Sequence, residues 1–395
     1  MTLISLNLTQ LEQYRQQFPT LSHKAYFNFG GQGTMPQGAI TAIHQAHEYV
    51  QRSGPFSNEV NRWITQETKR MREAIAAELS VSESTITLTE SVSAGCNIAL
   101  WGMDWQPGDH LLMSDCEHHS AIAIALEIQH RFGIEISICP LMATLNQGDP
   151  AAVIAQHLRP TTRLVLLSHI LWNTGQLLPL AEIAQVCHEL AYSRPIRVLV
   201  DAAQSVGLLP LKLDELGVDF YAFTGHKWWC GPAGVGGLYV RSDALESLRP
   251  TYVGWRGITK NAIGYPTGYL PDGRRFEVGT SDYTLYGGLR AAIATHHQWG
   301  TANERYQRIL ELSHYLWQRL AALPNLTCLR TALPETGLVS FQLAEGNHDQ
   351  LVEFLERQGF LLRMIVNPDC IRACIHYFTL EAEIDRLVEA IQKFR

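Results

Sequence analysis

A chain of 395 residues with 46% hydrophobic and 17% charged side chains can bury a large core, which excludes an intrinsically disordered protein. The 31 basic and 38 acidic residues give a formal charge of −7 without any basic run, so neither nucleic acid nor an anionic membrane is expected as a partner. No apolar stretch reaches the ~18 residues of a membrane span, and no signal peptide is seen, so a cytoplasmic protein is expected.

The eight cysteines are scattered along the chain and form no CxxC pair. This distribution suits a reducing compartment, and we predict no metal site from it. The length suits one large domain together with a smaller one.

Strands and helices alternate through the first 240 residues. The periodicity predicts helices at residues 7–18, 37–52 and 58–79, one ending at 101, one ending near 131, and two at 149–158 and 180–191. Strands are predicted from residue 25 and at 85–88, 109–114, 134–139, 163–168 and 197–200. This alternation indicates a mostly parallel α/β sheet with both faces covered, in which ligands bind beyond the carboxyl ends of the strands.

The pattern changes after residue 240. Residues 250–283 are rich in Gly, Tyr and Pro and are expected to be irregular, and a long helical region is predicted at roughly 285–323. Strands at 338–343, 360–365 and 370–377 then alternate with helices at 347–358 and 380–394. We therefore predict a large α/β domain over residues 21–285 and a smaller α+β domain from residues 1–20 and 286–395.

Lys227 stands between a hydrophobic, strand-like run that extends from 206 to 223 with interruptions and the sequence Trp-Trp-Cys-Gly-Pro. Lysine is rarely buried unless it is paired or used. We interpret Lys227 as the lysine that forms an imine with pyridoxal phosphate (PLP). The alternative is a surface lysine whose stem lies on the protein while its ammonium stays in water.

PLP also needs an anion at its pyridine nitrogen. Asp201 ends a predicted buried strand, and its carboxylate can keep that nitrogen protonated. Gln204 can donate to the oxygen on the PLP ring. The alternatives are a helix N-cap for Asp201 and an ordinary first-turn residue for Gln204.

The phosphate of PLP needs hydrogen-bond donors, and helix N-termini supply them. Ser93 and Ala94 come at the start of a predicted helix, and Thr224 and His226 flank the lysine. Each of these residues can equally be a capping residue. His118 ends another strand and can stack on the PLP ring, although spacing alone does not separate it from His119.

Arg372 lies in the apolar segment Cys370-Ile-Arg-Ala-Cys. A buried arginine needs an anionic partner, and a substrate carboxylate fits its fork geometry. An internal salt bridge or an edge position explains it about equally well. Asn173 can help to hold that carboxylate, or it can be a turn residue before Thr-Gly.

Taken together, these residues resemble the class V aminotransferase family, the fold type I PLP enzymes that include the cysteine desulfurases. The resemblance runs from about residue 26 to 377 and is carried by Glu117-His118, Asp201-Ala-Ala-Gln and Thr224-Gly-His-Lys. It implies PLP as the cofactor, a mostly parallel seven-stranded sheet in the large domain, and Lys227, His118 and Asp201 as catalytic residues. It also selects His118 over His119.

The resemblance implies a homodimer with shared active sites. The segment Phe276-Glu-Val-Gly-Thr280 is similar to the one whose threonine reaches the phosphate of the neighbouring subunit. Trp255 and Arg256 are implied to enter from the partner and to shape the pocket for the substrate side chain. Gly30 lies in a turn that resembles the family's substrate-side turn.

Within the family, the segments Trp172-Asn-Thr-Gly-Gln, His226-Lys-Trp-Trp-Cys, Tyr252-Val-Gly-Trp-Arg and Pro368-Asp-Cys-Ile-Arg are most similar to the cyanobacterial-type L-cysteine/cystine C–S lyases. This similarity implies α,β-elimination of a small amino acid to pyruvate and ammonia, with cysteine persulfide from cystine or sulfide from cysteine.

A cysteine or selenocysteine desulfurase that supplies sulfur for Fe–S assembly is the first alternative, followed by transamination or epimerisation. Desulfurases carry a nucleophilic cysteine on a mobile loop, and in one subgroup that loop lies between two arginines. Here Arg363 and Arg372 are too close in sequence for such a loop, and Cys328 and Cys370 lie in apolar runs. Cys230, three residues after Lys227, is the one thiol that we do not exclude from the site.

Overall fold

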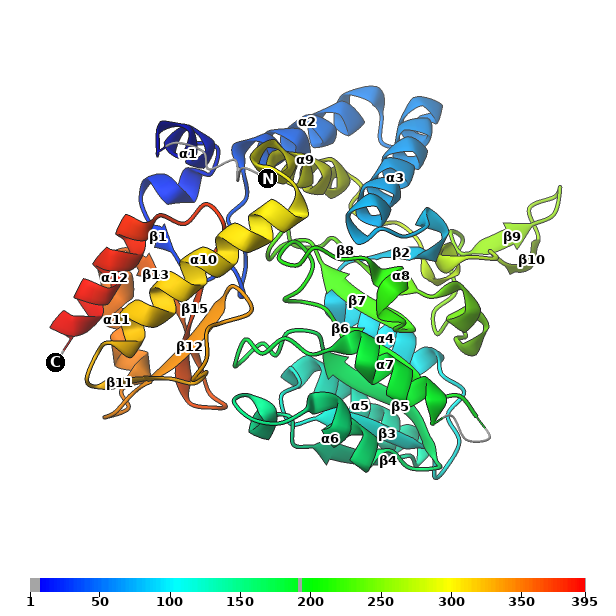
Figure 1. The fold of residues 1–395 in the computed structure, drawn as a ribbon. Coiled ribbons are helices and arrows are strands. Elements are labelled where there is room, and N and C mark those ends of the chain that lie inside the picture. The colour runs from blue at the N-terminus through cyan, green and yellow to red at the C-terminus, as the bar shows by residue number, and fades with distance from the viewer. Residues whose placement is uncertain (1–7, 191–193, 395) are drawn as a thin grey trace.

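The computed structural model describes residues 8–190 and 194–394. A large part built on a seven-stranded sheet stands beside a smaller part built on a four-stranded sheet (Figure 1). The expected α/β architecture with an additional α+β part is confirmed, whereas the exact domain limits at 20/21 and 285/286 stay a prediction.

The seven strands of the large sheet follow the order β2-β8-β7-β6-β5-β3-β4. Their bounds are β2 Ile86–Thr89, β3 His110–Ser114, β4 Glu135–Cys139, β5 Thr162–Ser168, β6 Arg197–Asp201, β7 Phe220–Thr224 and β8 Gly236–Val240. β8 runs opposite to the other six strands, so the prediction of a mostly parallel seven-stranded sheet is confirmed. Of the hydrophobic run before Lys227, only its end forms a strand, β7.

Both faces of this sheet are covered, as the continuous apolar strands require. In β6, Val198 and Val200 belong to one buried cluster and Leu199 belongs to the cluster on the opposite face. The helices are α2 Gln37–Ser53, α3 Asn58–Leu79, α4 Val92–Gly102, α5 His119–Phe132, α6 Pro150–His157, α7 Leu180–Glu189 and α8 Leu213–Leu216. Their ends follow capping chemistry: the Ser57 hydroxyl accepts from the Val60 N–H at the start of α3, and Gly133 takes a left-handed conformation after α5.

The smaller sheet is antiparallel and has the order β11-β12-β15-β14. Its strands are β11 Leu326–Cys328, β12 Leu338–Leu343, β14 Arg363–Ile365 and β15 Cys370–Cys374. Helices α10 Ala302–Ala321, α11 His348–Arg357 and α12 Glu381–Lys393 pack on it around their own apolar core. A short parallel pair, β1 Ala25–Tyr26 with β13 Phe360–Leu361, joins the N-terminal segment to this part.

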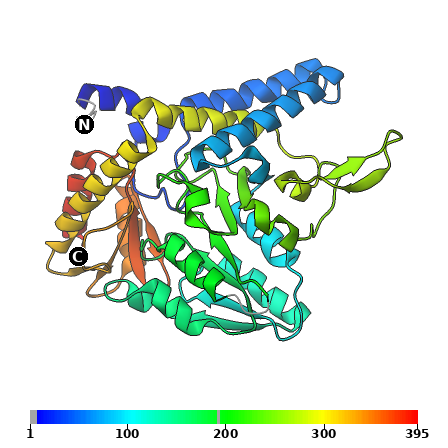
Figure 2. The same ribbon diagram turned by 45° about the vertical axis from the view of Figure 1, so that its right-hand side comes forward.

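Several predicted elements differ from the structure. The helical region 285–323 is two helices, α9 Thr284–Trp299 and α10, because Gly300 breaks the helix and Thr301 starts a new capping box. The strand at 360–365 is split into β13 and β14, and the strand from 370 ends at Cys374. The segment 250–283 is not entirely irregular, since β9 Ile258–Lys260 and β10 Pro266–Tyr269 form a hairpin that projects from the body (Figure 2).

The N-terminal helix α1, Leu8–Arg15, is held against the C-terminal part of the chain. The buried Arg15 side chain pairs with Glu383 at 2.6 Å and donates to the carbonyl of Phe378 at 2.5 Å. Residue 7 of the predicted helix and residue 191 of the helix predicted at 180–191 lie outside the described residues. In residues 8–190 and 194–394, no helix is long and apolar enough to cross a membrane.

Candidate active site

The predicted site residues gather at one edge of the large sheet. Asp201 is the last residue of β6, Lys227 lies three residues after β7, and His118 follows β3 as the N-cap of α5. Carboxyl ends of parallel strands meet at the same edge, which explains why residues far apart in sequence come together. Arg372, from β15 of the smaller sheet, lies near enough to act on the charge of both Lys227 and His118. We call Lys227, Asp201, His118 and Arg372 the Lys227 site.

Lys227 and Asp201 influence each other. Burial lowers the pKa of the Lys227 amine to about 8; the carboxylate of Asp201 acts against this, and the charge of Arg372 adds to it. Burial also raises the pKa of Asp201, against the hydrogen bond from the Ala203 N–H at 3.0 Å and the charge of Lys227. An amine that gives up its proton near neutral pH is suited to proton transfer and covalent chemistry.

His118, not His119, is the half-buried histidine of the pair. Its ring packs edge-on against Trp172 with centroids 5.3 Å apart, and its Nδ1 lies 2.8 Å from the Ser120 hydroxyl. Burial, followed by the charges of neighbours that include Lys227, lowers the pKa of His118 to about 4. The imidazole is therefore neutral at pH 7.

The start of α4 approaches the end of β7. A Cβ on Gly95 would lie only 2.8 Å from the Cβ of Ala222, so a glycine is required at this contact. Ser91 caps α4 by accepting from the Ala94 N–H at 3.2 Å. Ser93, which with Ala94 is predicted to bind phosphate, lies in the first turn of α4, and its hydroxyl is 3.4 Å from the Ser120 hydroxyl.

Beyond β7, the Thr224 hydroxyl lies 2.6 Å from Nδ1 of His226. The two residues predicted to bind phosphate beside the lysine therefore contact each other, close to the N-terminus of α4. A helix N-terminus and neighbouring hydroxyls make a suitable cradle for an anion.

Arg372 is almost completely buried and has no acidic partner among the described residues. One guanidinium nitrogen donates to the Trp172 carbonyl at 2.5 Å, while its Nε makes no hydrogen bond. The indole nitrogen of Trp172 and Oδ1 of Asn173 are also buried without partners. β15 lies between β12 and β14, which excludes the edge position considered for Arg372, while the absence of an acidic partner among the described residues argues against the internal salt bridge. A cluster of polar atoms without partners in this part of the chain remains.

Gly30 lies between Arg372 and Gln204. Its carbonyl accepts from Nε2 of Gln204 at 2.9 Å, and a Cβ at Gly30 would lie 3.0 Å from Cζ of Arg372. The Oε1 of Gln204 accepts from the Trp228 indole at 3.0 Å. Gln204 is thus fixed by the protein, and one amide N–H remains for the predicted contact with a ring oxygen.

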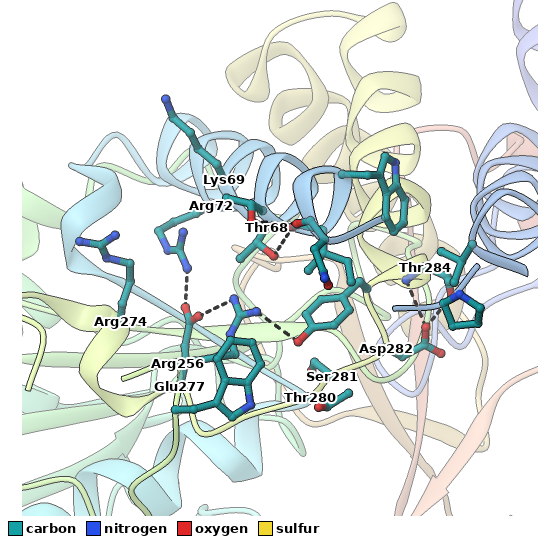
Figure 3. Close-up of a pocket in the computed structure, with 18 of the residues that line it drawn as sticks. Thr68, Lys69, Arg72, Arg256, Arg274, Glu277, Thr280, Ser281, Asp282 and Thr284 are labelled. Carbon is teal, nitrogen blue, oxygen red and sulfur yellow. Dashed lines mark hydrogen bonds and ion pairs between the residues drawn. The ribbon is translucent and has the colours of Figure 1, made fainter. Parts of the chain in front are cut away.

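Three predicted residues lie elsewhere. Thr280, Trp255 and Arg256 line a separate cleft of about 1210 Å³, which has none of the Lys227 site residues in its wall; we call it the Thr280 cleft (Figure 3). Arg256 pairs there with Glu277 at 3.1 Å, and Glu277 also pairs with Arg72 at 2.5 Å. Within one chain, these residues do not meet Lys227.

A family model described as "Aminotransferase class-V" matches residues 26–387. The chain belongs to the class V aminotransferase family. Isopenicillin N epimerase from Streptomyces clavuligerus is 29% identical over 92% of this chain and 93% of its own length. The cysteine desulfurase of Escherichia coli O127:H6 is 27% identical over 97% of this chain and 98% of its own length.

Two solved structures are much more similar to this chain. A complex of the cystine C-S lyase C-DES with its reaction product, cysteine persulfide, has a TM-score of 0.94 and 54% identity, covering 96% of this chain and 100% of that chain. A C-DES mutant with glycine covalently linked to the PLP cofactor has a TM-score of 0.95 and 53% identity, covering 96% and 99%. The predicted resemblance to the C–S lyase branch is confirmed.

Nothing in the sequence placed Arg363 near the Lys227 site. It pairs directly with Arg372 across β14 and β15, so both side chains leave the same face of the sheet, and Arg363 is the exposed one. Its charge acts on Lys227 and His118 as that of Arg372 does. The sequence places Arg363 and Arg372 in two neighbouring predicted strands, but it does not show that the two residues are paired across those strands.

Proposed function

We propose that this protein is a PLP-dependent C–S lyase that cleaves L-cystine or L-cysteine by α,β-elimination. The observation that carries the proposal is Arg372, a buried arginine with no acidic partner in residues 8–190 and 194–394, near Lys227, a lysine of lowered pKa. The first offers a place for an amino-acid carboxylate and the second a base. The identity of more than half with a cystine C–S lyase supports the same reaction.

The residues of the Lys227 site fit PLP. Lys227 holds the cofactor covalently, and Asp201 keeps its pyridine nitrogen protonated. Its phosphate would lie at the N-terminus of α4, where Ser93 and Ala94 stand, with Thr224 and His226 on the other side. His118 would cover the ring, and its neutral state would avoid a second positive charge beside the pyridinium. When bound, PLP supplies an electron sink for the pair released from the substrate Cα–H bond.

The protein positions the substrate and moves the proton. Arg372 and Asn173 hold the α-carboxylate, for which the Nε of Arg372 and the Trp172 indole are unpaired donors. Lys227 takes the proton from Cα once its amine is free. With water, cystine then gives pyruvate, ammonia and cysteine persulfide, and cysteine gives pyruvate, ammonia and sulfide.

Arg363 favours cystine over cysteine. Cystine carries a second carboxylate, and the exposed guanidinium beside Arg372 provides a matching charge at the open side of the site. Cysteine has no group for this arginine. We therefore assign the second carboxylate of cystine to Arg363.

The desulfurase alternative needs an accessible thiolate. All eight cysteines are buried, and burial raises the pKa of Cys328 and Cys370 to about 12. Cys230 is fully buried and its pKa is likewise raised by burial. These features disfavour a persulfide on the enzyme, and with it sulfur delivery to Fe–S assembly.

A homodimer with shared sites completes the proposal. Thr280, Trp255 and Arg256 lie in the Thr280 cleft, apart from the Lys227 site of their own chain. A twofold partner brings its Thr280 to the phosphate and its Trp255 and Arg256 to the substrate side chain.

The decisive experiment supplies purified holoenzyme with cystine and quantifies pyruvate, cysteine persulfide and alanine. We expect pyruvate and persulfide in equal amounts, and a loss of about 10³-fold or more in rate for Lys227→Ala. Lys212→Ala, which removes an exposed lysine paired with Glu215, serves as the control and should keep full activity. Alanine in place of pyruvate, or persulfide bound to the protein, would overturn the lyase proposal.

A further inference from the structure

Two buried histidines contact the backbone directly after Lys227. Nε2 of His376 lies 3.1 Å from the carbonyl oxygen of Trp228, and Nε2 of His296 lies 2.8 Å from the carbonyl oxygen of Trp229. His296 belongs to α9 and His376 follows β15, so the two donors come from different elements. Both hold the turn of residues 226–230 that contains Lys227, which we call the lysine turn. Neither histidine belongs to the set that binds cofactor or substrate.

The remaining carbonyls of the lysine turn are also fixed. The carbonyl of His226 accepts from the Gly33 N–H at 2.7 Å, and that of Lys227 accepts from the Cys230 N–H at 3.0 Å. Cys230 closes this turn with φ of 53°, a left-handed conformation that costs a non-glycine residue about 1 kcal/mol or more. A turn that contains such a residue keeps its shape only if its surroundings hold it.

The protonation of both rings follows from their partners. A carbonyl oxygen only accepts, so each imidazole must carry a proton on Nε2. Burial lowers the pKa of His296 to about 3 and that of His376 well below its usual range, so both rings are neutral and Nδ1 carries no proton. Nδ1 of His296 then accepts from the Tyr377 hydroxyl at 2.5 Å.

The contacts of His376 show most clearly what its imidazole contributes. Its Nδ1 has no hydrogen-bond partner, so the bond to the Trp228 carbonyl is the only one its ring makes among the described residues. The ring stacks with Trp228 at 5.8 Å and with Phe378 at 4.2 Å between centroids, contacts that a phenylalanine would make equally well. What the imidazole adds to this apolar stack is its single donor, aimed at the lysine turn.

We propose that His296 and His376 are positioning residues that fix the amine of Lys227 at the reacting centre by holding the two carbonyls that follow it. The inference rests on the proposed role of Lys227 as the cofactor lysine. Because His376 is four residues beyond Arg372, the same segment holds the carboxylate-binding arginine and the lysine turn. The groups that set the charge around the amine are Asp201, Arg372, Cys374 and Arg363, so a displaced turn changes the distances of the amine from all four.

The test compares substitutions that remove the donor with substitutions that keep it. His296→Phe and His376→Phe keep the ring shape and lose the donor, whereas His296→Gln and His376→Gln can place an amide N–H near the Nε2 position. His110→Phe is the matched control, since His110 is fully buried and bonded to Thr162 and Ser137 but starts β3, at the sheet edge opposite Lys227. The readouts are the pH midpoint of the visible absorption band of the holoenzyme and the rate of PLP release.

We expect the Phe variants to shift that midpoint by about half a pH unit or more and to release PLP about three- to tenfold faster. The Gln variants should lie close to the wild type, and His110→Phe should lower the melting temperature without moving either readout. Phe variants that behave like His110→Phe would overturn the inference. If a Phe variant does not fold, an Asn variant at the same position replaces it, because the shorter amide of Asn does not reach the carbonyl. The Asn and Gln variants must then differ in both readouts. Equal behaviour of Asn and Gln would overturn the inference. A wild-type protein without a visible band would instead overturn the proposed function itself.

Discussion

Two glycines of the N-terminal loop determine how closely the chain packs around the reactive residues. A Cβ on Gly33 would lie 2.1 Å from the carbonyl oxygen of Lys227, and one on Gly30 would lie 3.0 Å from the guanidinium of Arg372. Neither position requires a left-handed backbone, so the requirement for glycine is one of space. Single methyl groups at these positions therefore test the site without removing any functional group.

Gly30→Ala should weaken substrate binding more than turnover. The new methyl group would lie 2.9 Å from Sγ of Cys374 and 3.0 Å from the guanidinium of Arg372, so it pushes on both. We expect KM for cystine to rise about tenfold, the cost of one displaced charge-assisted hydrogen bond, with kcat changed much less. Steady-state kinetics measure both constants. Gly38→Ala, at a position with no atom within 4 Å of the added Cβ, is the control and should leave KM unchanged. An unaltered KM in Gly30→Ala would contradict the placement of Arg372.

The pKa of Lys227 predicts how the apoenzyme captures PLP. Burial lowers this pKa from 10.5 to about 8, so the neutral, reactive amine predominates above pH 8. The capture rate should rise about tenfold per pH unit below pH 8 and level off above it. Stopped-flow absorbance with added PLP measures this profile, and a midpoint near 10 would contradict the lowered pKa.

The same pKa has a consequence for stability. Between about pH 8 and 10.5, the unfolded chain binds a proton on this lysine that the folded chain does not bind, so stability increases with pH across this window. Lys227→Met removes this contribution. The difference in free energy of unfolding between apo wild type and Lys227→Met should therefore move in favour of the wild type as the pH rises from 8 to 10.5.

At the scale of elements, a buried ion pair helps to attach α1 to the C-terminal part, together with Tyr14, whose hydroxyl lies 2.6 Å from that of Tyr377. Arg15 and Glu383 are both more than 90% buried and lie 2.6 Å apart, and Arg15 also donates to the Phe378 carbonyl. Removing one partner of such a pair leaves an uncompensated charge, whereas removing both is far less costly. This contribution to the attachment of α1 thus depends on the pair and not on either residue alone.

Arg15→Met should lower the free energy of unfolding by about 3–5 kcal/mol, and Arg15→Met with Glu383→Leu should recover most of the loss. Urea denaturation of the holoenzyme measures both. Arg52→Ala is the control, because its pair with Glu48 is exposed and is worth about 0–1 kcal/mol. If the double variant is less stable than the single one, the pair does not help to attach α1 in this way.

Sequence patterns predicted elements best where burial is periodic. The prediction for α3 at 58–79 matches its bounds, because apolar residues recur along one face of the helix. The β9–β10 hairpin was missed because Ile263 and Tyr265 are exposed and no face of it is buried, so no alternation of burial marks it. The break at Gly300 was readable from the capping box of Thr301 and Glu304, but the apolar period continues on both sides of it.

The site was predictable to the extent that it consists of strand ends. His118, Asp201 and Lys227 follow strands that the pattern identifies, and parallel strands bring such ends together. Arg363 and the two positioning histidines were not predictable in this way. Their roles depend on the register of β14 against β15 and on the packing of α9, which are tertiary properties.

At the scale of the whole molecule, the Thr280 cleft is lined by none of the Lys227 site residues, and the proposed homodimer makes the two places parts of one shared site. If a partner completes each site, two inactive variants can complement each other. Lys227→Ala disables the Lys227 site, and Arg256→Ala disables the Thr280 cleft without leaving Glu277 unpaired, because Arg72 remains.

Mixed dimers of Lys227→Ala and Arg256→Ala chains, isolated with two affinity tags, should contain one intact site and recover about half of the wild-type activity per dimer. Mixed dimers of Lys227→Ala and Arg372→Ala should recover none, because both residues belong to the Lys227 site of their own chain and neither site is then intact. Equal recovery in the two mixtures, or none in the first, would contradict shared sites.

The lysine turn accepts hydrogen bonds from Gly33, near the N-terminus, and from His376, near the C-terminus. These donors are therefore synthesised at very different times on the ribosome. When residue 240 has been made, the nascent chain already contains every strand of the large sheet, together with Lys227 and Asp201. His376, which donates to the Trp228 carbonyl, is translated much later, near the C-terminal end. His296 of α9, which donates to the Trp229 carbonyl, is also translated after the last strand of the sheet. The turn around Lys227 therefore acquires its full set of backbone hydrogen bonds only after translation has passed residue 376.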